Sequence, residues 1–296
     1  TILALLEYPS ATMLGITRML QDADFRAKVI KKIDDPIVKG FWLNEFEKYG
    51  EKQRMEAISP VLNKVGQFLS SSIMRNIVGQ PKSEIDLRYA MDHQRIVIVN
   101  LSKGKIGEDN SALLGSMIFT KFQLDAMSRA NIPEKDRVDF YLYVDEFQNF
   151  ATDSFATILS EARKYRLNLT MANQYIAQMS MEVKDAVFGN VGSIIAFRMG
   201  ADDARAMQRY FEPTFLEYDL VHMHNRHFVI TMTIDGEKVP AFSAISLNLP
   251  PFGADQTEVI VNNSRSRYAS SRKVVEDYVG ERYMGIGKPQ AANPLR

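Results

Sequence analysis

The strongest constraint on the fold is an apolar, aromatic-rich run that ends in two adjacent carboxylates. The run spans residues 138–144 (Val-Asp-Phe-Tyr-Leu-Tyr-Val), and Asp145 and Glu146 follow it directly. Such a run is typical of a buried central strand in a parallel sheet. Two acids at the carboxyl end of a buried strand suit a site that needs negative charge, such as a Mg²⁺ site. A strand that simply ends in two solvated acids is the alternative, and these residues alone leave both open.

The segment after the acid pair predicts a helix followed by a second strand. Apolar residues at helical spacing predict a helix over about 154–162, and a basic cluster at 163–166 follows where cations suit the helix dipole. Residues 167–173 then predict a short buried strand that ends at Gln174. Open α/β sheets bind ligands at the carboxyl ends of their strands. We therefore expect four polar side chains to converge on one rim of the sheet: Asp145, Glu146, Arg163 and Gln174.

Residues 144–178, VDEFQNFATDSFATILSEARKYRLNLTMANQYIAQ, resemble the C-terminal ATPase half of TraG/TraD-type coupling proteins. Those proteins are DNA-pumping ATPases of conjugative type IV secretion, in the wider HerA/FtsK group of P-loop motors. The resemblance runs from about Asp86 to Pro250. It implies an α/β fold with a mainly parallel, RecA-like P-loop NTPase sheet, which fits the strand and helix pattern.

The resemblance also implies a role for each of the four polar residues. Asp145 would face Mg²⁺, through water, and Glu146 would be the catalytic base for ATP hydrolysis. Arg163 would match the arginine that reaches into a neighbouring subunit's nucleotide site. Gln174 would match the polar sensor of the γ-phosphate. ATP and Mg²⁺ are accordingly the implied cofactors, and Asp145 and Gln174 their implied contacts.

The chain departs from the family in lacking a P-loop. The G-x-x-x-x-G-K-[ST] pattern, whose backbone amides cradle phosphates, is absent, and both Gly-Lys pairs of the chain lack the preceding glycine and the following hydroxyl. We therefore expect this chain to be the C-terminal part of a longer motor, with the P-loop and any membrane anchor upstream. By itself it should neither bind ATP tightly nor hydrolyse it.

Composition excludes several classes of protein. Lys+Arg and Asp+Glu are both 36, so no overall basic field marks a nucleic-acid binder, although cations could still gather on one surface. The chain has no cysteine, which excludes disulfides and thiolate metal sites and fits the cytoplasm. No apolar stretch approaches the roughly 20 residues of a membrane span. We expect a cytoplasmic protein, with any tether to the inner membrane outside this sequence.

Three parts follow from the periodicity of the chain. Residues 1–83 predict an all-helical subdomain, 84–250 the C-terminal part of the ATPase domain, and 251–296 a flexible basic tail, with a short helix near 274–279. The middle part has further predicted strands. They are a buried strand over 95–101, another over 192–198, and an edge hairpin of 226–234 and 237–245 around Asp235-Gly236, a strong two-residue turn signal.

Three cations outside the main pattern are candidate contacts to DNA or phosphate. Lys103 and Lys105 lie in a glycine-containing loop after the predicted strand 95–101, and Arg198 ends the predicted strand 192–198. A plain surface turn is the simpler explanation for the two lysines, and an ion pair with Asp202 or Asp203 explains Arg198 as well. Basic residues of the tail could likewise contact a nucleic acid or partner, with a solvated tail as the alternative: Arg265, Arg267, Arg272 and Lys273.

The leading hypothesis is an ATP-driven DNA translocase that couples DNA to a type IV secretion channel. The resemblance implies a homo-hexameric ring, with DNA and channel or relaxosome proteins as partners. One alternative is a secretion-channel ATPase that moves protein or pilus subunits. A second alternative, from another class, is a non-catalytic interaction module that uses a degenerate ATPase fold.

Overall fold

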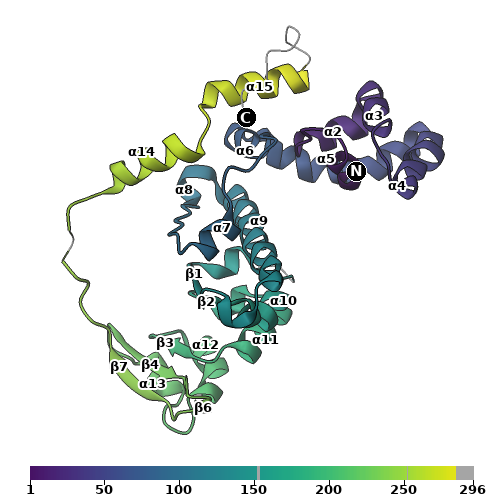
Figure 1. Ribbon diagram of the computed structural model, residues 1–296. Helices are drawn as coiled ribbons and strands as arrows, with labels where there is room; N and C mark the ends of the chain where they lie inside the picture. The colour runs from purple at the N-terminus through teal and green to yellow at the C-terminus, as the bar shows by residue number, and fades with distance from the viewer. Residues whose placement is uncertain (152–153, 252, 285–296) are drawn as a thin grey trace. The chain divides into compact units, whose positions relative to one another are not determined.

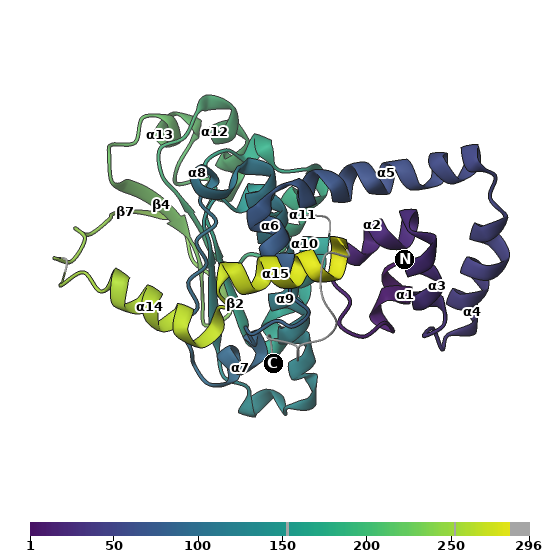
Figure 2. The same ribbon diagram turned by 90° about the horizontal axis from the view of Figure 1, so that it is seen from above.

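The computed structural model describes residues 1–151, 154–251 and 253–284 (Figures 1 and 2). The chain forms two compact units. The first, which we call the helical unit, consists of Thr1–Asp86 and the chain from Asp255 onward. The second, the α/β unit, is Leu87–Ala254.

The N-terminal part of the helical unit contains helices only, and local sequence signals start two of them. Asp22 caps one helix by accepting a hydrogen bond from the Phe25 backbone N–H at 3.0 Å. Asp35 caps the next, with Pro36 at its first position. The apolar faces of these helices enclose a core that includes Met19, Val29, Ile33 and Trp42. The helices are α1 (Ile2–Leu6), α2 (Leu14–Gln21), α3 (Ala23–Ile30), α4 (Pro36–Gly40), α5 (Glu51–Ser70) and α6 (Ser72–Val78).

The expectation of a flexible tail is wrong for much of its length. Two helices occupy it, α14 (Thr257–Tyr268), whose side chains are exposed, and α15 (Arg272–Met284), which packs on α2 and α6. Val275 of α15 is buried, and the Arg282 carbonyl accepts a hydrogen bond from Arg18 at 2.7 Å. Gly79 permits the close approach, because a Cβ there would lie 3.0 Å from Val279. Residues 285–296 lie outside the described residues.

Of the basic tail residues, Arg272 forms an ion pair with Glu276 at 2.7 Å, while Arg265 and Arg267 are exposed on α14. Their contact with a nucleic acid or partner stays a prediction. Among the helices within residues 1–151, 154–251 and 253–284, none combines the length and the apolar character needed to cross a membrane.

The α/β unit is a mixed structure with more helix than strand. Its helices are α7 (Leu87–Asp92), α8 (Lys103–Ile106), α9 (Glu108–Met127), α10 (Ser154–Glu161), α11 (Met181–Asn190), α12 (Ala201–Met207) and α13 (Glu217–Val221). Its strands are β1 (Phe140–Val144), β2 (Leu167–Met171), β3 (Ile194–Ala196), β4 (His227–Thr231), β5 (Thr233–Ile234), β6 (Glu237–Lys238) and β7 (Phe242–Ile245). The strands β1 and β2 lie beside α9, α10 and α11 (Figure 1).

The sheets are less parallel than the sequence predicts. Strands β1 and β2 pair in parallel, with Phe140 opposite Leu167, as expected for the βαβ unit. Strand β3, however, joins an antiparallel sheet of order β3-β4-β7. The prediction of a mainly parallel sheet is therefore wrong for the described residues. Strand periodicity marks extended segments, but the direction of pairing depends on which long-range partner a strand finds.

The predicted hairpin turn is confirmed. Asp235 and Gly236 connect β5 to β6 with φ values of 51° and 86°. Two consecutive positive φ values define the turn that suits the twist of a two-residue hairpin, and Asp-Gly adopts it readily. Just outside the turn, β4 pairs with β7, so the two arms of the predicted hairpin do run antiparallel.

The predicted buried strand over 95–101 does not form in the described structure. Residues 95–102 form neither helix nor strand, and Ile96 and Ile98 are 90% and 78% exposed. Nor is β1 buried on both faces, since Tyr141 and Tyr143 are exposed while alternate residues pack on the core. Within the described residues β1 pairs with β2 alone. A β-branched run favours extended backbone, but a strand also needs a neighbour to hydrogen-bond.

One buried arginine fixes the entry into both parallel strands. Arg129, just after α9, is fully buried, and its Nε lies 3.0 Å from Asp92 Oδ1. Its guanidinium also donates to the carbonyls of Tyr165 at 2.8 Å and Val138 at 2.5 Å. Those two residues precede β2 and β1. Burial lowers the pKa of Arg129, and the Asp92 carboxylate acts in the opposite direction. The side chain thus links the residues that precede both strands to the end of α9.

Replacing Arg129 with methionine should lower the free energy of unfolding by roughly 3 kcal/mol, because two carbonyls lose their donor and Asp92 keeps only its other partner, Arg88. The measurement is a urea titration followed by circular dichroism. The matched control is Arg205→Met, which breaks an exposed pair with Glu217 and should cost less than about 1 kcal/mol. Equal losses in the two variants would contradict the structural role of Arg129.

Candidate functional site

A tight turn after β1 presents the acid pair at the carboxyl end of the parallel strands. The Val144 carbonyl accepts from Ala172 N–H at 2.9 Å, and Phe147 N–H donates to the Ala172 carbonyl at 3.0 Å. Between these two bonds Glu146 adopts a left-handed backbone conformation with φ of 50°. Such a conformation is unfavourable for a residue with a side chain and tends to occur at functional sites. The turn places the Glu146 carboxylate beside the residues that follow β2.

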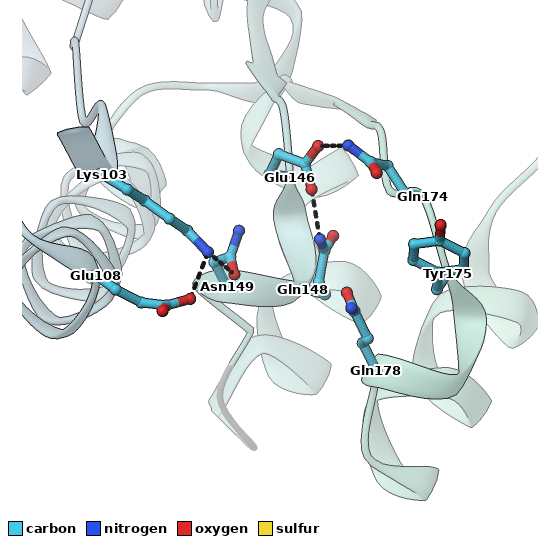
Figure 3. Close-up of a pocket in the computed structure, with 8 residues that line it drawn as sticks. All are labelled: Lys103, Glu108, Glu146, Gln148, Asn149, Gln174, Tyr175 and Gln178. Atoms are coloured by element: carbon cyan, nitrogen blue, oxygen red, sulfur yellow. Dashed lines mark hydrogen bonds and ion pairs between the residues drawn. The ribbon is translucent and has the colours of Figure 1, made fainter.

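The Glu146 carboxylate lines a polar pocket of about 270 Å³ (Figure 3). The pocket lies within the α/β unit and is lined by side chains from α8, α9, the turn after β1, and the segment after β2. Apart from Tyr175, every lining side chain ends in a charge or an amide. Such a pocket suits a charged ligand rather than an apolar one. The lining residues are Lys103, Glu108, Glu146, Gln148, Asn149, Gln174, Tyr175 and Gln178.

Two glutamine side chains hold the Glu146 carboxylate. Gln174 Nε2 donates to Oε1, and Gln148 Nε2 donates to Oε2 at 2.5 Å (Figure 3). Both donors are neutral amides, and together they fix the orientation of the carboxylate. The structure thus brings together Glu146 and Gln174, as the sequence predicts.

Lys103 brings a positive charge into the same pocket. Its ammonium lies 2.6 Å from Glu108 Oε1 and 3.1 Å from Asn149 Oδ1 (Figure 3). The hydrogen bond from Lys103 lowers the pKa of the exposed Glu108 carboxyl.

Lys105 and Arg198, the other candidate cations, are exposed and do not line this pocket. Within the described residues, Arg198 also lacks the ion pair with Asp202 or Asp203 that offered a simple explanation.

Asp145 is exposed and lines a second, larger groove next to the pocket. Its Oδ1 accepts the Glu146 backbone N–H at 3.0 Å, so the carboxylate also stabilises the turn. The groove, about 680 Å³, lies between residues 97–103, α9 and β1, and shares Lys103, Glu146, Asn149 and Gln174 with the polar pocket. The two acids therefore face adjoining spaces at the same end of β1.

Arg163 is not at this rim, and the expectation that four side chains converge there is wrong in this respect. The residue lies in η6 (Ala162–Tyr165), before β2 begins, whereas the pocket lies beyond its end. Five strand residues at about 3.3 Å each separate the two edges by roughly 16 Å. Arg163 is exposed, and its side chain forms no ion pair or hydrogen bond with the described residues. Its neighbours Lys164 and Arg166 each form an ion pair, with Glu161 and Asp139.

The donor set suits a Mg²⁺ ion shared between the protein and phosphate oxygens. Mg²⁺ usually takes one or two carboxylates from a protein and completes its octahedron with water and phosphate. Asp145 and Glu146 supply carboxylates at one strand end, with a cation, Lys103, nearby. Within the described part of the chain, no three acidic or imidazole side chains form a set that could hold a metal alone. The residues present fit a metal that arrives with a nucleotide.

Sequence reasoning missed Gln148, Asn149 and Glu108. The amides of Gln148 and Asn149 directly follow the acid pair in the turn η5 (Phe147–Asn149), so their proximity in the chain was a signal. Glu108 had only its place at the start of α9 to mark it. The contact of Asn149 with Lys103 follows from the tertiary structure, because 46 positions separate the two residues.

Comparison with known proteins agrees with the resemblance expected from the sequence. Residues 139–209 match a protein family described as the TraM recognition site of TraD and TraG. The matched segment contains β1, the acid pair, β2 and Gln174. No curated protein matches the chain.

Solved structures with a similar fold include three of one bacterial conjugative coupling protein, TrwBdeltaN70 or TrwB. The unbound monoclinic form matches with a TM-score of 0.55 at 13% identity over 84% of this chain and 63% of that chain. The trigonal form with sulphate matches with a TM-score of 0.58 at 13% identity over 91% of this chain and 65% of that chain. The complex of TrwB with the ATP analogue ADPNP matches with a TM-score of 0.55 at 14% identity over 85% and 60%.

The chain spans between 60% and 65% of the length of these TrwB structures. At such low identity they establish the fold and not the activity. The chain is thus similar to TraD and TraG over residues 139–209, and it shares the fold of the conjugative coupling protein TrwB over most of its length.

Proposed function

We propose that this chain is the C-terminal part of an ATP-driven motor that moves DNA for conjugative transfer through a type IV secretion system. The supporting observation is the pocket at the end of β1 and β2, where the Glu146 carboxylate is held by Gln174 with the Lys103 ammonium nearby. A carboxylate in that place can take a proton from water. The match to TraD and TraG, and the fold shared with a conjugative coupling protein, connect the pocket to DNA transfer.

The proposed chemistry divides among the residues as follows. Glu146, in its own subunit's site, orients water and accepts its proton, and Gln174 fixes the Glu146 carboxylate and contacts the terminal phosphate. Lys103 would contact phosphate oxygens. Asp145 would contact the metal ion through a water molecule. A bound Mg²⁺ would supply positive charge against the phosphates. The phosphates themselves need the amide cradle of a P-loop, and residues 1–296 do not contain its G-x-x-x-x-G-K-[ST] pattern.

The proposed assembly is a homo-hexameric ring in which Arg163 serves the site of a neighbouring subunit. Its exposure at the opposite edge of the sheet, with no ion pair among the described residues, leaves the guanidinium available to a partner.

DNA and a relaxosome or channel protein are the proposed partners; the family match names a TraM recognition site in TraD and TraG. The proposed location is the cytoplasmic face of the inner membrane. Lys105 and Arg198 remain proposed DNA contacts.

DNA should stimulate the ATPase activity of the full-length natural protein, and the stimulation should weaken as salt rises, because contacts to phosphate release counterions. The assay measures phosphate release with and without DNA at two salt concentrations, with Glu146→Gln as the inactive control.

Two other outcomes would favour a different function. ATPase activity that DNA does not change would favour a motor for protein or pilus subunits. No activity in the full-length protein, together with binding of a relaxosome or channel partner, would favour a non-catalytic module built on the same fold.

A further inference from the structure

We infer that Gln148 is a positioning residue for Glu146, so that the turn η5 determines where the reactive carboxylate points. The inference rests on the proposed function and deepens it, because Gln148 lay outside every role predicted from the sequence. Its Nε2 donates to Glu146 Oε2 at 2.5 Å, on the opposite carboxylate oxygen from Gln174 (Figure 3). A carboxylate whose two oxygens each accept a hydrogen bond from a different segment has little freedom to rotate.

The turn that carries Gln148 is anchored on both sides of it. Phe147 is 1% exposed within the core of the α/β unit, and its N–H is bonded to Ala172. Phe150 lies directly against Gly115 of α9, where any side chain would collide with the ring. The backbone around Gln148 is therefore fixed by packing, and a rigid support is what a positioning side chain requires.

The orientation of the Gln148 amide follows from its surroundings. Its nitrogen must face Glu146, because the reverse orientation would put an oxygen against a carboxylate. The amide oxygen is then buried without a hydrogen-bond partner among the described residues. An unsatisfied buried acceptor is unfavourable, and such groups call for an explanation. Here the hydrogen bond from Gln148 Nε2 to Glu146 explains why the amide oxygen of Gln148 is buried without a partner.

The next residue of the same turn, Asn149, holds the positively charged ammonium of Lys103. Asn149 Oδ1 accepts from the Lys103 ammonium at 3.1 Å. Two successive amides of η5 thus hold the two opposite charges of the pocket, the first with its nitrogen and the second with its oxygen. Because Gln148 touches Glu146 rather than the reacting atoms, its effect on turnover must pass through that carboxylate.

The test measures steady-state ATP hydrolysis by the full-length protein in two variants of Gln148. Gln148→Met keeps the side chain's length without a donor and should lower kcat by about 10- to 100-fold with KM for ATP unchanged, since a hydrogen bond to a charged group is lost. Gln148→Glu should lower kcat further by repelling Glu146. The control is Gln123→Met, because Gln123 lies on α9 and lines neither the polar pocket nor the adjoining groove.

A double-mutant cycle separates positioning from a general loss of structure. In the Glu146→Gln background, Gln148→Met should have little further effect on kcat, because the group it positions is already gone. Full additivity, or a wild-type kcat in Gln148→Met, would overturn the inference while leaving the role of Glu146 intact. Loss of ATP binding in Gln148→Met would overturn it as well.

A readout independent of turnover distinguishes this inference from the proposed function. Glu146→Ala should shift the side-chain amide NMR signals of Gln148 and Gln174 and leave those of Gln178 in place. Unshifted Gln148 signals would overturn the contact itself. A full-length protein without ATPase activity would overturn the proposed function, and with it the catalytic meaning of the contact, even if the amide signals shift.

Discussion

Replacing Glu146 with glutamine should leave ATP binding by the full-length protein intact and lower its turnover by about 10²- to 10⁴-fold, the usual contribution of a general base. The neutral amide keeps the length of the side chain but cannot accept a proton from water. Its one amide nitrogen would also replace a carboxylate oxygen and face a donor amide, that of Gln174 or that of Gln148. The measurement combines the affinity for a fluorescent ATP analogue with the rate of phosphate release.

The companion variant Asp145→Asn should behave differently from Glu146→Gln. Because Asp145 is proposed to contact Mg²⁺ through water, Asp145→Asn should raise the Mg²⁺ concentration needed for half-maximal activity. Glu146→Gln should not have this effect. Melting temperatures of both variants close to wild type would establish that the turn survives, since the amide oxygen introduced by Asp145→Asn can still accept the Glu146 backbone N–H. Unchanged turnover in Glu146→Gln would remove this residue from its role.

Replacing Arg163 with alanine should lower hydrolysis in assembled rings by roughly 10³- to 10⁵-fold while sparing nucleotide binding, as expected for an arginine that stabilises transition-state charge. The side chain cannot reach its own subunit's pocket, because it lies before β2 and the pocket lies after it. The matched control is Lys164→Ala in the same turn, since Lys164 is paired with Glu161 at 3.7 Å and should matter little.

Mixing two inactive variants distinguishes a role in trans from a role in cis. In a ring with a head-to-tail interface, equal amounts of Arg163→Ala and Glu146→Gln subunits leave about a quarter of the interfaces with both groups intact. Activity should therefore reappear on mixing and subunit exchange if Arg163 serves its neighbour. If Arg163 acts within its own subunit, every site lacks one group and the mixture stays inactive.

The local elements around the site could be predicted from the sequence. The apolar run before Asp145, the helix after it, the strand before Gln174 and the Asp235-Gly236 turn are all present, because side-chain periodicity and turn chemistry act within a few residues. The carboxyl ends of two parallel strands must share an edge, which brings Glu146 and Gln174 together. The match to TraD and TraG, over residues 139–209, contains both Glu146 and Gln174.

The tertiary structure alone decided which distant segments meet. Residues 95–101 have the composition of a strand and yet pair with nothing as a strand, β3 pairs antiparallel, and α15 packs on helices from the other end of the chain. Arg163 lies away from the pocket, while Lys103, Gln148 and Asn149 enter it. Local patterns determine whether a segment is helical or extended. Its neighbours depend on the burial and hydrogen bonding of the whole unit, which no short window of sequence contains.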